Sequence, residues 1–154
     1  MGAREGTKMG VPVSVLLRRK GDRVVSLTTD ATVRDAASRL AAENIGAVII
    51  TEPDGALAGI LSERDIVREL GSTGQDVLDA SVARAMTEQV KTCSPTTNTD
   101  ELMQLMTERR IRHVPVVDDA QKLVGVISIG DVVKWQLDEL SMEAEELANY
   151  VRGG

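Results

Sequence analysis

Hydrophobic positions in the first half of the chain alternate between helical and strand-like spacing. A helix is predicted over 33–43, where apolar residues recur on one face and Thr32 stands at the N-cap position. The run AVIIT at 47–51 is continuous and β-branched, which is typical of a strand buried on both faces. After a turn, the run LAGIL at 57–61 predicts a second strand in a hairpin with the first. A short strand is also predicted at 24–27.

A second helix is predicted directly after this hairpin. Ser62 stands at its N-cap position, and Ile66, Val67 and Leu70 are expected to face inward. Gly71 is expected to end the helix, because glycine often follows the last helical residue. The order of elements is therefore strand, helix, strand, strand, helix.

The same pattern returns at a constant offset of 66 residues. The segments GILSERDIV and GVISIGDVV begin at Gly59 and Gly125, and no gap is needed to align the two copies. The second copy predicts strands at 90–93, 113–117 and 123–127, a helix at about 99–110 and a helix that opens at Ser128. Two homologous units are expected to bury their sheets together, because about 60 residues form only a marginal core alone. The expected boundaries are 12–71 for the first unit, 72–79 for a polar linker, 80–137 for the second unit and 138–154 for a terminal helical extension.

The final helix departs from the repeat because its apolar stripe continues almost to the last residue. The stripe consists of Val132, Val133, Gln136, Leu137, Leu140, Ala144, Leu147, Tyr150 and Val151, with acidic residues on the other positions. Its own unit is too small to bury a stripe of this length. We therefore expect it to pack against a second copy of the chain, and a frayed acidic tail is the alternative.

Composition and charge exclude several classes of function. The 154 residues include two aromatic ones, and 24 acidic residues outnumber 18 basic ones, for a net charge of −6. Nucleic-acid binding is not expected, because it relies on a basic surplus or on aromatic platforms. One cysteine and one histidine exclude an intrachain disulfide and argue against a zinc site. No apolar run is long enough to span a membrane and the N-terminal residues lack a signal-peptide core, so a cytoplasmic protein is expected.

The paired pattern G-h-h-S-x-x-D-h, which starts at Gly59 and at Gly125, resembles the cystathionine-β-synthase (CBS) domain. Two units in tandem are similar to the CBS pair called a Bateman module, and the resemblance leaves out only the first dozen residues and the terminal extension. It implies an α/β (α+β) fold of two β-α-β-β-α units related by pseudo-two-fold symmetry, followed here by an extended C-terminal helix. It also implies clefts between the units that bind adenine nucleotides, and often a head-to-head homodimer.

Two aspartates are the main candidates for ligand binding. Asp65 and Asp131 each follow a helix N-cap serine by three residues, where a carboxylate can accept two hydrogen bonds from the vicinal diol of a ribose. The alternative is that each aspartate only satisfies the N-terminus of its helix. Ser62 and Ser128 are expected to cap their helices and to offer a donor to a phosphate.

The resemblance distributes further candidates between two clefts. The first cleft would contain Ser62, Arg64, Asp65, Arg112 and His113. The second would contain Ile45, Gly46, Ala47, Ser128, Gly130 and Asp131, with Lys20 as a possible source of positive charge. A purely solvated role is the alternative for Arg64, Arg112 and Lys20, and it is favoured for Arg109 and Arg110.

His113 can serve in ligand contact or in packing, but it is a poor catalytic candidate because no nucleophile pattern accompanies it. Cys93, Met103 and Met106 are interpreted as core residues.

We expect a non-enzymatic sensor without catalytic residues or a metal ion. AMP and NAD(H) are the favoured ligands, with ADP, ATP or S-adenosylmethionine as alternatives, and binding would shift the relation between units or chains. A separate target protein would read that shift. The alternative is a structural or adaptor protein that acts through its terminal helix without a ligand. An enzyme acting on nucleotides is disfavoured, because a paired-carboxylate or metal constellation is lacking.

Overall fold

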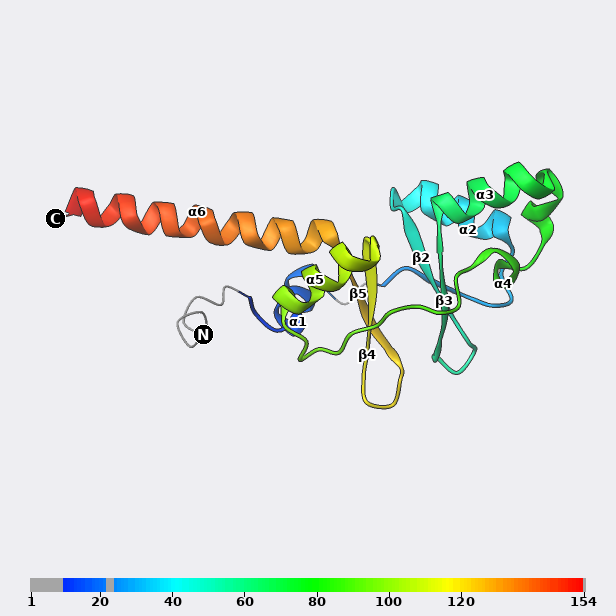
Figure 1. Ribbon diagram of the computed structural model, residues 1–154, viewed down its shortest axis with the longest axis horizontal. Helices are drawn as coiled ribbons and strands as arrows, with labels where there is room; N and C mark the ends of the chain where they lie inside the picture. Colours follow the sequence, from blue (N-terminus) through cyan, green and yellow to red (C-terminus); the bar gives the residue numbers. More distant parts are fainter. Residues whose placement is uncertain (1–9, 22–23, 154) are drawn as a thin grey trace. The chain divides into compact units, whose positions relative to one another are not determined.

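The computed structural model describes residues 10–21 and 24–153, which group into two compact units (Figure 1). The sheet unit contains 24–95 and 114–126, and the helical unit contains the described residues of 10–21, 96–113 and 127–153. The N-terminal residues for which no signal peptide is expected lie largely outside the described part of the chain.

A three-stranded sheet in the order β1-β2-β3 forms the centre of the sheet unit. β1 (Ser26–Thr28) runs parallel to β2 (Ala47–Thr51), and β3 (Leu57–Ser62) runs antiparallel to β2. The hairpin predicted from the AVIIT and LAGIL runs is therefore confirmed. All residues of β2 after Ala47 are buried, as the continuous apolar run predicts.

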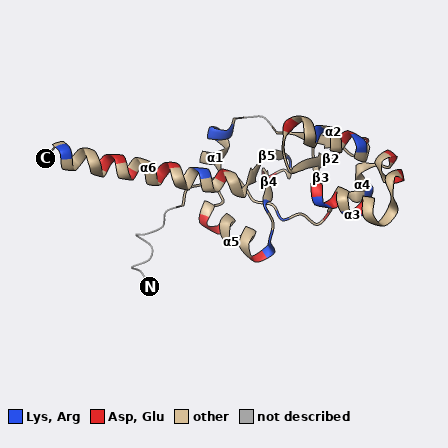
Figure 2. Cartoon of the chain, turned by 90° about the horizontal axis from the view of Figure 1, so that it is seen from above, with Lys and Arg blue, Asp and Glu red and all other residues tan. Residues whose placement is uncertain are grey.

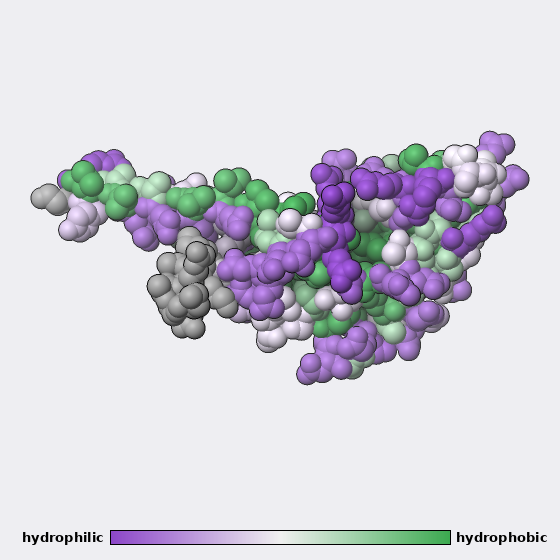
Figure 3. All heavy atoms as spheres, viewed as in Figure 1, coloured by the Kyte–Doolittle hydropathy of each residue, from purple (hydrophilic) through white to green (hydrophobic). Residues whose placement is uncertain are grey.

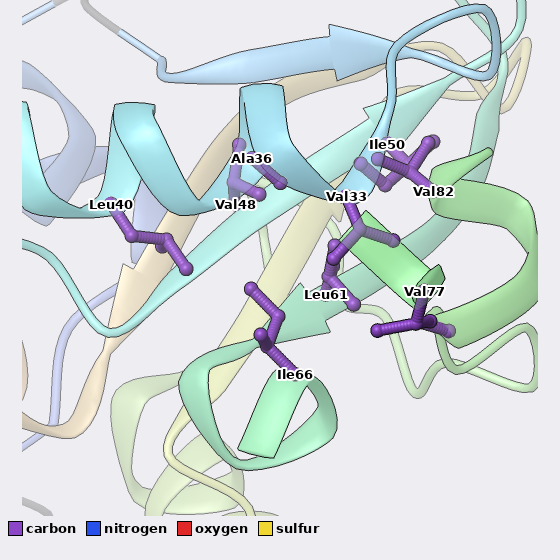
Figure 4. Packing of buried hydrophobic residues seen from close by; sticks show 10 residues of the cluster. Val33, Ala36, Leu40, Val48, Ile50, Leu61, Ile66, Val77 and Val82 are labelled. Atoms are coloured by element: carbon purple, nitrogen blue, oxygen red, sulfur yellow. The ribbon is translucent and has the colours of Figure 1, made fainter. Parts of the chain in front are cut away.

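Two capped helices cover this sheet. α2 (Val33–Glu43) begins in a capping box with Thr32, and α3 (Glu63–Thr73) begins in a capping box with Ser62. Figure 4 shows the aliphatic side chains that the helices, the sheet and the following segment bring together. These buried residues are Val33, Ala36, Leu40, Val48, Ile50, Leu61, Ile66, Val77, Val82 and Ala85.

Two expectations for α3 are wrong. Val67 is 66% exposed, because Ile66 and Leu70 occupy the inward face and a neighbouring helical position points about 100° away. Gly71 lies inside the helix, where a glycine costs only about 1 kcal/mol relative to alanine. The helix instead ends before Gly74, whose φ of 90° is a conformation that glycine adopts readily.

The segment predicted as a polar linker is a structured part of the sheet unit. It contains the end of α3 and the 3₁₀ helix η2 (Gln75–Asp79), and it is followed by α4 (Val82–Ala85). Val77 is fully buried in the aliphatic core. Its place as a boundary between the two repeats stays a prediction.

The helical unit consists mainly of α1 (Val13–Lys20), α5 (Thr99–Arg109) and α6 (Ile129–Gly153). Between α5 and α6 the chain forms the hairpin of β4 (His113–Val117) and β5 (Leu123–Ser128), most of which belongs to the sheet unit. In α5, Met106 is buried and Met103 is half-buried. The elements predicted for the second repeat are thus confirmed, except for its first strand.

Backbone hydrogen bonds recur at the offset of 66 residues that relates the two repeats. Glu63 N donates to Gly46 O at 2.9 Å, and Ile129 N donates to Arg112 O at 2.8 Å. The C-cap residues of α2 and α5, which are Asn44 and Arg110, also stand at equivalent positions, and both adopt the left-handed backbone conformation. The sequence repeat is therefore a repeat of local structure.

The segment that begins each repeat packs beside α2 or α5 of the other repeat. Val82 N donates to Ala31 O just before α2, and Val13 N donates to Thr97 O just before α5. Because 31 and 97 are equivalent positions, α1 takes the place beside α5 that α4 takes beside α2. The compact units therefore combine segments from different parts of the chain.

The strand predicted at 90–93 is wrong, since only Cys93 pairs there, in an isolated parallel bridge with Val116. In the first repeat, Ile49 N donates to Val25 O and lengthens the pairing of β1 with β2. The residue equivalent to Ile49 is Pro115, which has no N–H to donate. The proline therefore explains why this ladder stops after one residue.

The two glycines of α3 provide a matched test of its end. Each is exposed, and an added Cβ would meet no described atom within 4 Å at either position. We expect Gly71→Ala to stabilise the protein by about 0.5–1 kcal/mol. Gly74→Ala should destabilise it by about 1–3 kcal/mol, because its backbone conformation is strained for alanine. Urea unfolding measures both, and effects of equal sign would contradict the assignment of the helix end.

Candidate functional site

The two serine–aspartate pairs form equivalent capping boxes at the N-termini of α3 and α6. Ser62 N donates to Asp65 Oδ2 at 2.9 Å, and Asp65 N donates to Ser62 Oγ at 3.1 Å. Ser128 N donates to Asp131 Oδ2 at 2.8 Å, and Asp131 N donates to Ser128 Oγ at 3.1 Å. Both serines therefore cap their helices as expected, whereas ligand contact by the four residues stays a prediction.

The two carboxylates differ in their other partners and in their exposure. Asp65 receives a hydrogen bond at 2.8 Å from Arg68 of its own helix, and its side chain is only 9% exposed. Asp131 receives a hydrogen bond at 2.7 Å from Lys20 Nζ of α1, and its side chain is 26% exposed. Asp131 is therefore the more accessible of the two carboxylates.

A cavity of about 330 Å³ lies beside Asp131 in the helical unit. It is lined by Leu16, Arg19, Lys20, Asp131, Lys134 and Trp135. Three of these side chains are cations and one is a carboxylate, which suits a ligand that carries both an anionic group and hydroxyl groups. The volume lies at the small end of the range for small-molecule sites, about 300–1,000 Å³.

Ion pairs join α1 to α6 along this cavity. Lys20 pairs with Asp131, and Arg19 pairs with Asp138, which lies about two helical turns further along α6. Burial by itself raises the pKa of Asp131, but hydrogen bonds from Lys20 and Ser128 outweigh it, so the pKa lies below its ordinary value. Asp131 is therefore ionised at neutral pH and can act only as an acceptor.

His113 lies half-buried near the same charged groups. Burial lowers its pKa, and the positive charges of Lys20 and Arg112 lower it further, while Asp131 acts in the opposite direction. The imidazole is therefore neutral at pH 7. It can accept or donate a hydrogen bond, but it adds no positive charge to the cavity.

The other candidates from the sequence divide between the two units. Ser62, Arg64, Asp65 and the segment 45–47 belong to the sheet unit, with Arg64 exposed in the first turn of α3. Lys20, Arg112, His113, Ser128, Gly130 and Asp131 belong to the helical unit. The structure brings Lys20 to Asp131, whereas the two clefts implied by the resemblance would join residues of different units and stay predictions. Arg109 and Arg110 are exposed.

Sequence reasoning missed four lining residues of the cavity, which are Leu16, Arg19, Lys134 and Trp135. One signal was available, because Lys134 and Trp135 follow Asp131 by three and four residues and so share its helix face. For Leu16 and Arg19 the sequence carries no such signal, since only the packing of α1 in the helical unit brings them to α6.

Three further features of the described residues concern a metal site, the cysteine and a membrane span. No group of three histidine, cysteine, aspartate or glutamate side chains among them is placed to hold a metal ion. Cys93 is buried, as expected for a core residue, and burial raises the pKa of its thiol to about 11. Within the same part of the chain, none of the helices combines the length and the apolar character that a membrane span requires.

Comparison with known proteins gives consistent matches. The family model for the CBS domain matches residues 18–72 and 80–138. The mitochondrial CBS domain-containing protein CBSX3 of Arabidopsis thaliana is 41% identical over 131 residues, which cover 82% of this chain and 63% of that protein. The chain thus spans less than two thirds of that relative's length.

Two solved structures extend the comparison. The crystal structure of a CBS-domain containing protein from Agrobacterium tumefaciens is 45% identical, with a TM-score of 0.76, and the match covers 82% of this chain and 99% of that one. A CBS domain protein from Pyrobaculum aerophilum complexed with AMP is 32% identical, with a TM-score of 0.71, and the match covers 79% and 89% of the two chains.

The single histidine makes the electrostatics of the helical unit testable. Because the pKa of His113 is lower in the folded state, the unfolded chain binds more protons between the two pKa values. The free energy of unfolding should therefore fall as the pH drops from about 7.5 through the ordinary histidine pKa of about 6.5 to 5.5. His113→Gln should flatten this dependence in urea unfolding at pH 5.5, 6.5 and 7.5. An equally steep dependence in the variant would contradict the assignment, because Asp131 titrates only at lower pH.

Proposed function

The chain belongs to the CBS-domain family as a tandem pair, and from this premise we propose that it is a regulatory module that binds an adenosine ligand without transforming it. One observation carries the proposal. The carboxylate of Asp131 is accessible at the edge of a cavity that also contains three cations. The AMP complex of the relative from Pyrobaculum aerophilum supports the choice of ligand class.

Asp131 recognises the ribose in this proposal. Its ionised carboxylate accepts hydrogen bonds from the two hydroxyls of the diol, while Ser128 N continues to hold Oδ2. A hydrogen bond to a charged group contributes about 1.5–3 kcal/mol. Each hydroxyl therefore accounts for about a tenfold to hundredfold preference for a nucleotide over a free base.

Arg19, Lys20 and Lys134 bind the phosphate in this proposal. They line the cavity from two helices, and each can donate to a phosphate oxygen. A cavity of about 330 Å³ favours a single nucleotide such as AMP over a dinucleotide. NAD(H), ADP, ATP and S-adenosylmethionine are the alternatives to be compared in the same assay.

The bound phosphate would also change the contact between α1 and α6. In the unliganded arrangement, Lys20 pairs with Asp131, and this pair is part of what joins the two helices. A phosphate draws Lys20 away from the carboxylate, while the ribose hydroxyls replace it there. Occupancy thereby shifts how α1 and α6 are held, and a separate target protein reads the altered surface.

The discriminating experiment is calorimetry with protein stripped of bound nucleotide. Wild type should bind AMP at least about tenfold more tightly than 2′-deoxy-AMP, because the deoxy compound lacks one of the two hydroxyls. Asp131→Asn should abolish that preference. The Asp131→Asn substitution also releases Lys20 from its ion pair, and this affects the binding of AMP and of 2′-deoxy-AMP alike. The ratio of the two affinities therefore reports the contact with the diol alone.

Asp35→Asn is the matched control, because Asp35 occupies the same position in the exposed capping box of α2. It should leave AMP binding and the ribose preference unchanged. The proposal is wrong if stripped wild type does not bind AMP at millimolar concentration, or if the Asp131→Asn variant keeps the preference for ribose. Binding that depends on Asp65 alone would place the ligand elsewhere.

A further inference from the structure

The second half of α6 extends past the other helices of its unit and is exposed on every side. All described residues from 141 to 153 are exposed (Figure 1). Large apolar side chains are nevertheless frequent on this helix, and Figure 3 shows hydrophobic residues along one side of it. The exposed large apolar residues of the whole helix are Val133, Leu137, Leu140, Met142, Leu147, Tyr150 and Val151, with exposed fractions between 40% and 79%.

The spacing of these side chains is that of a coiled coil. Alternating steps of four and three residues connect Val133, Leu137, Leu140, Ala144, Leu147 and Val151, which we call the α6 seam. This is a strict seven-residue repeat, with residues 137, 144 and 151 at the first position and 133, 140 and 147 at the fourth. The α6 seam spans 133–151, or about 27 Å at 1.5 Å per residue. A seam of nearly three heptads is the pattern that one helix presents to another helix.

The charges of α6 do not prevent the seam from pairing with an identical helix. Figure 2 shows acidic residues spaced along α6, and Asp138, Glu139, Glu145 and Glu146 all fall on the second and third heptad positions, which lie away from the seam. The positions that flank the seam hold Lys134, Gln136, Ser141, Glu143, Ala148 and Tyr150, so most of them are uncharged. Flanking charges normally select an unlike partner, and repeated like charges there would repel an identical one. The flanking positions of α6 contain neither charges that select an unlike partner nor repeated like charges that repel an identical one.

The same charges argue against a lipid surface as the occupant. Helices that lie on membranes carry lysine and arginine on their polar face, because they meet anionic lipids. The polar face of α6 is acidic instead. The match to the CBS family model ends at residue 138, and most of the α6 seam lies beyond that residue. The seam is therefore largely outside the part of the chain that the family pattern describes.

We propose that the α6 seam is an interface between two copies of this chain, which pair their α6 helices as a two-stranded coiled coil. This interface is separate from the cavity at Asp131. It does not require a bound nucleotide, so it can be tested whether or not the proposed ligand binds.

Leu140 and Met142 provide a matched pair of variants. They lie on the same helix and are 54% and 55% exposed, but only Leu140 belongs to the seam. We expect the wild-type full chain to self-associate in sedimentation equilibrium between 1 and 100 µM, roughly the range of moderate protein–protein affinities. Leu140→Gln combined with Leu147→Gln should weaken the association at least about 100-fold, because four leucines leave the paired seam. Met142→Gln should leave it unchanged.

Urea unfolding at a protein concentration at which wild type is monomeric serves as the folding control, since the exposed side chains of α6 contribute nothing to the aliphatic core and both variants should then keep the wild-type midpoint. The proposal is overturned if wild type is monomeric at 100 µM in this assay, roughly the weak limit of specific association. It is also overturned if the double variant associates like wild type, or if Met142→Gln weakens association as much as the double variant does. Association with liposomes of anionic lipid in place of self-association would assign the seam to a membrane.

Discussion

Hydrogen bonds between the segment at 11–13 and the start of α5 hold α1 in the helical unit, and the candidate site depends on them. Val13 N donates to Thr97 O, and Thr99 N donates to Val11 O, each at 2.8 Å. They fix α1 so that its basic last turn meets the first turns of α6. Without this placement, Ser128 would be the one remaining hydrogen-bond partner described for Asp131, and the cavity would lose Leu16, Arg19 and Lys20 from its lining.

Asp131 illustrates how a structural role and a binding role can coincide in one side chain. In the capping box, Ser128 N donates to the carboxylate and Asp131 N donates to Ser128 Oγ, so the position of the side chain does not depend on the ligand. The ion pair with Lys20 keeps it charged in spite of partial burial. Asp65 has the same cap, but its second partner is Arg68 of the same helix and its side chain is nearly buried. Equivalent positions in a repeat can therefore differ in what they are able to bind.

The elements and caps of this fold could be predicted from the sequence because their causes are local. Thr32 and Ser62 cap helices through residues three positions away, and the AVIIT run forms a buried strand because it is apolar on both faces. The wrong expectations depend on partners that are distant in sequence or on small geometric differences. Pro115 ends a ladder 22 residues from Cys93, and Gly74 ends a helix for which Gly71 offered an equally good signal.

The sequence alone determined the 66-residue repeat, the aliphatic core and the two serine–aspartate caps, since each follows from residue type and spacing within a short stretch. It also determined the heptad spacing of the α6 seam, because that pattern lies within one helix. Only the tertiary structure decided that Lys20 meets Asp131, 111 residues away, and that Arg19 and Leu16 complete the same cavity. The physical reason is that α1 packs on the helix of the other repeat, and this exchange depends on backbone hydrogen bonds that side-chain patterns do not record.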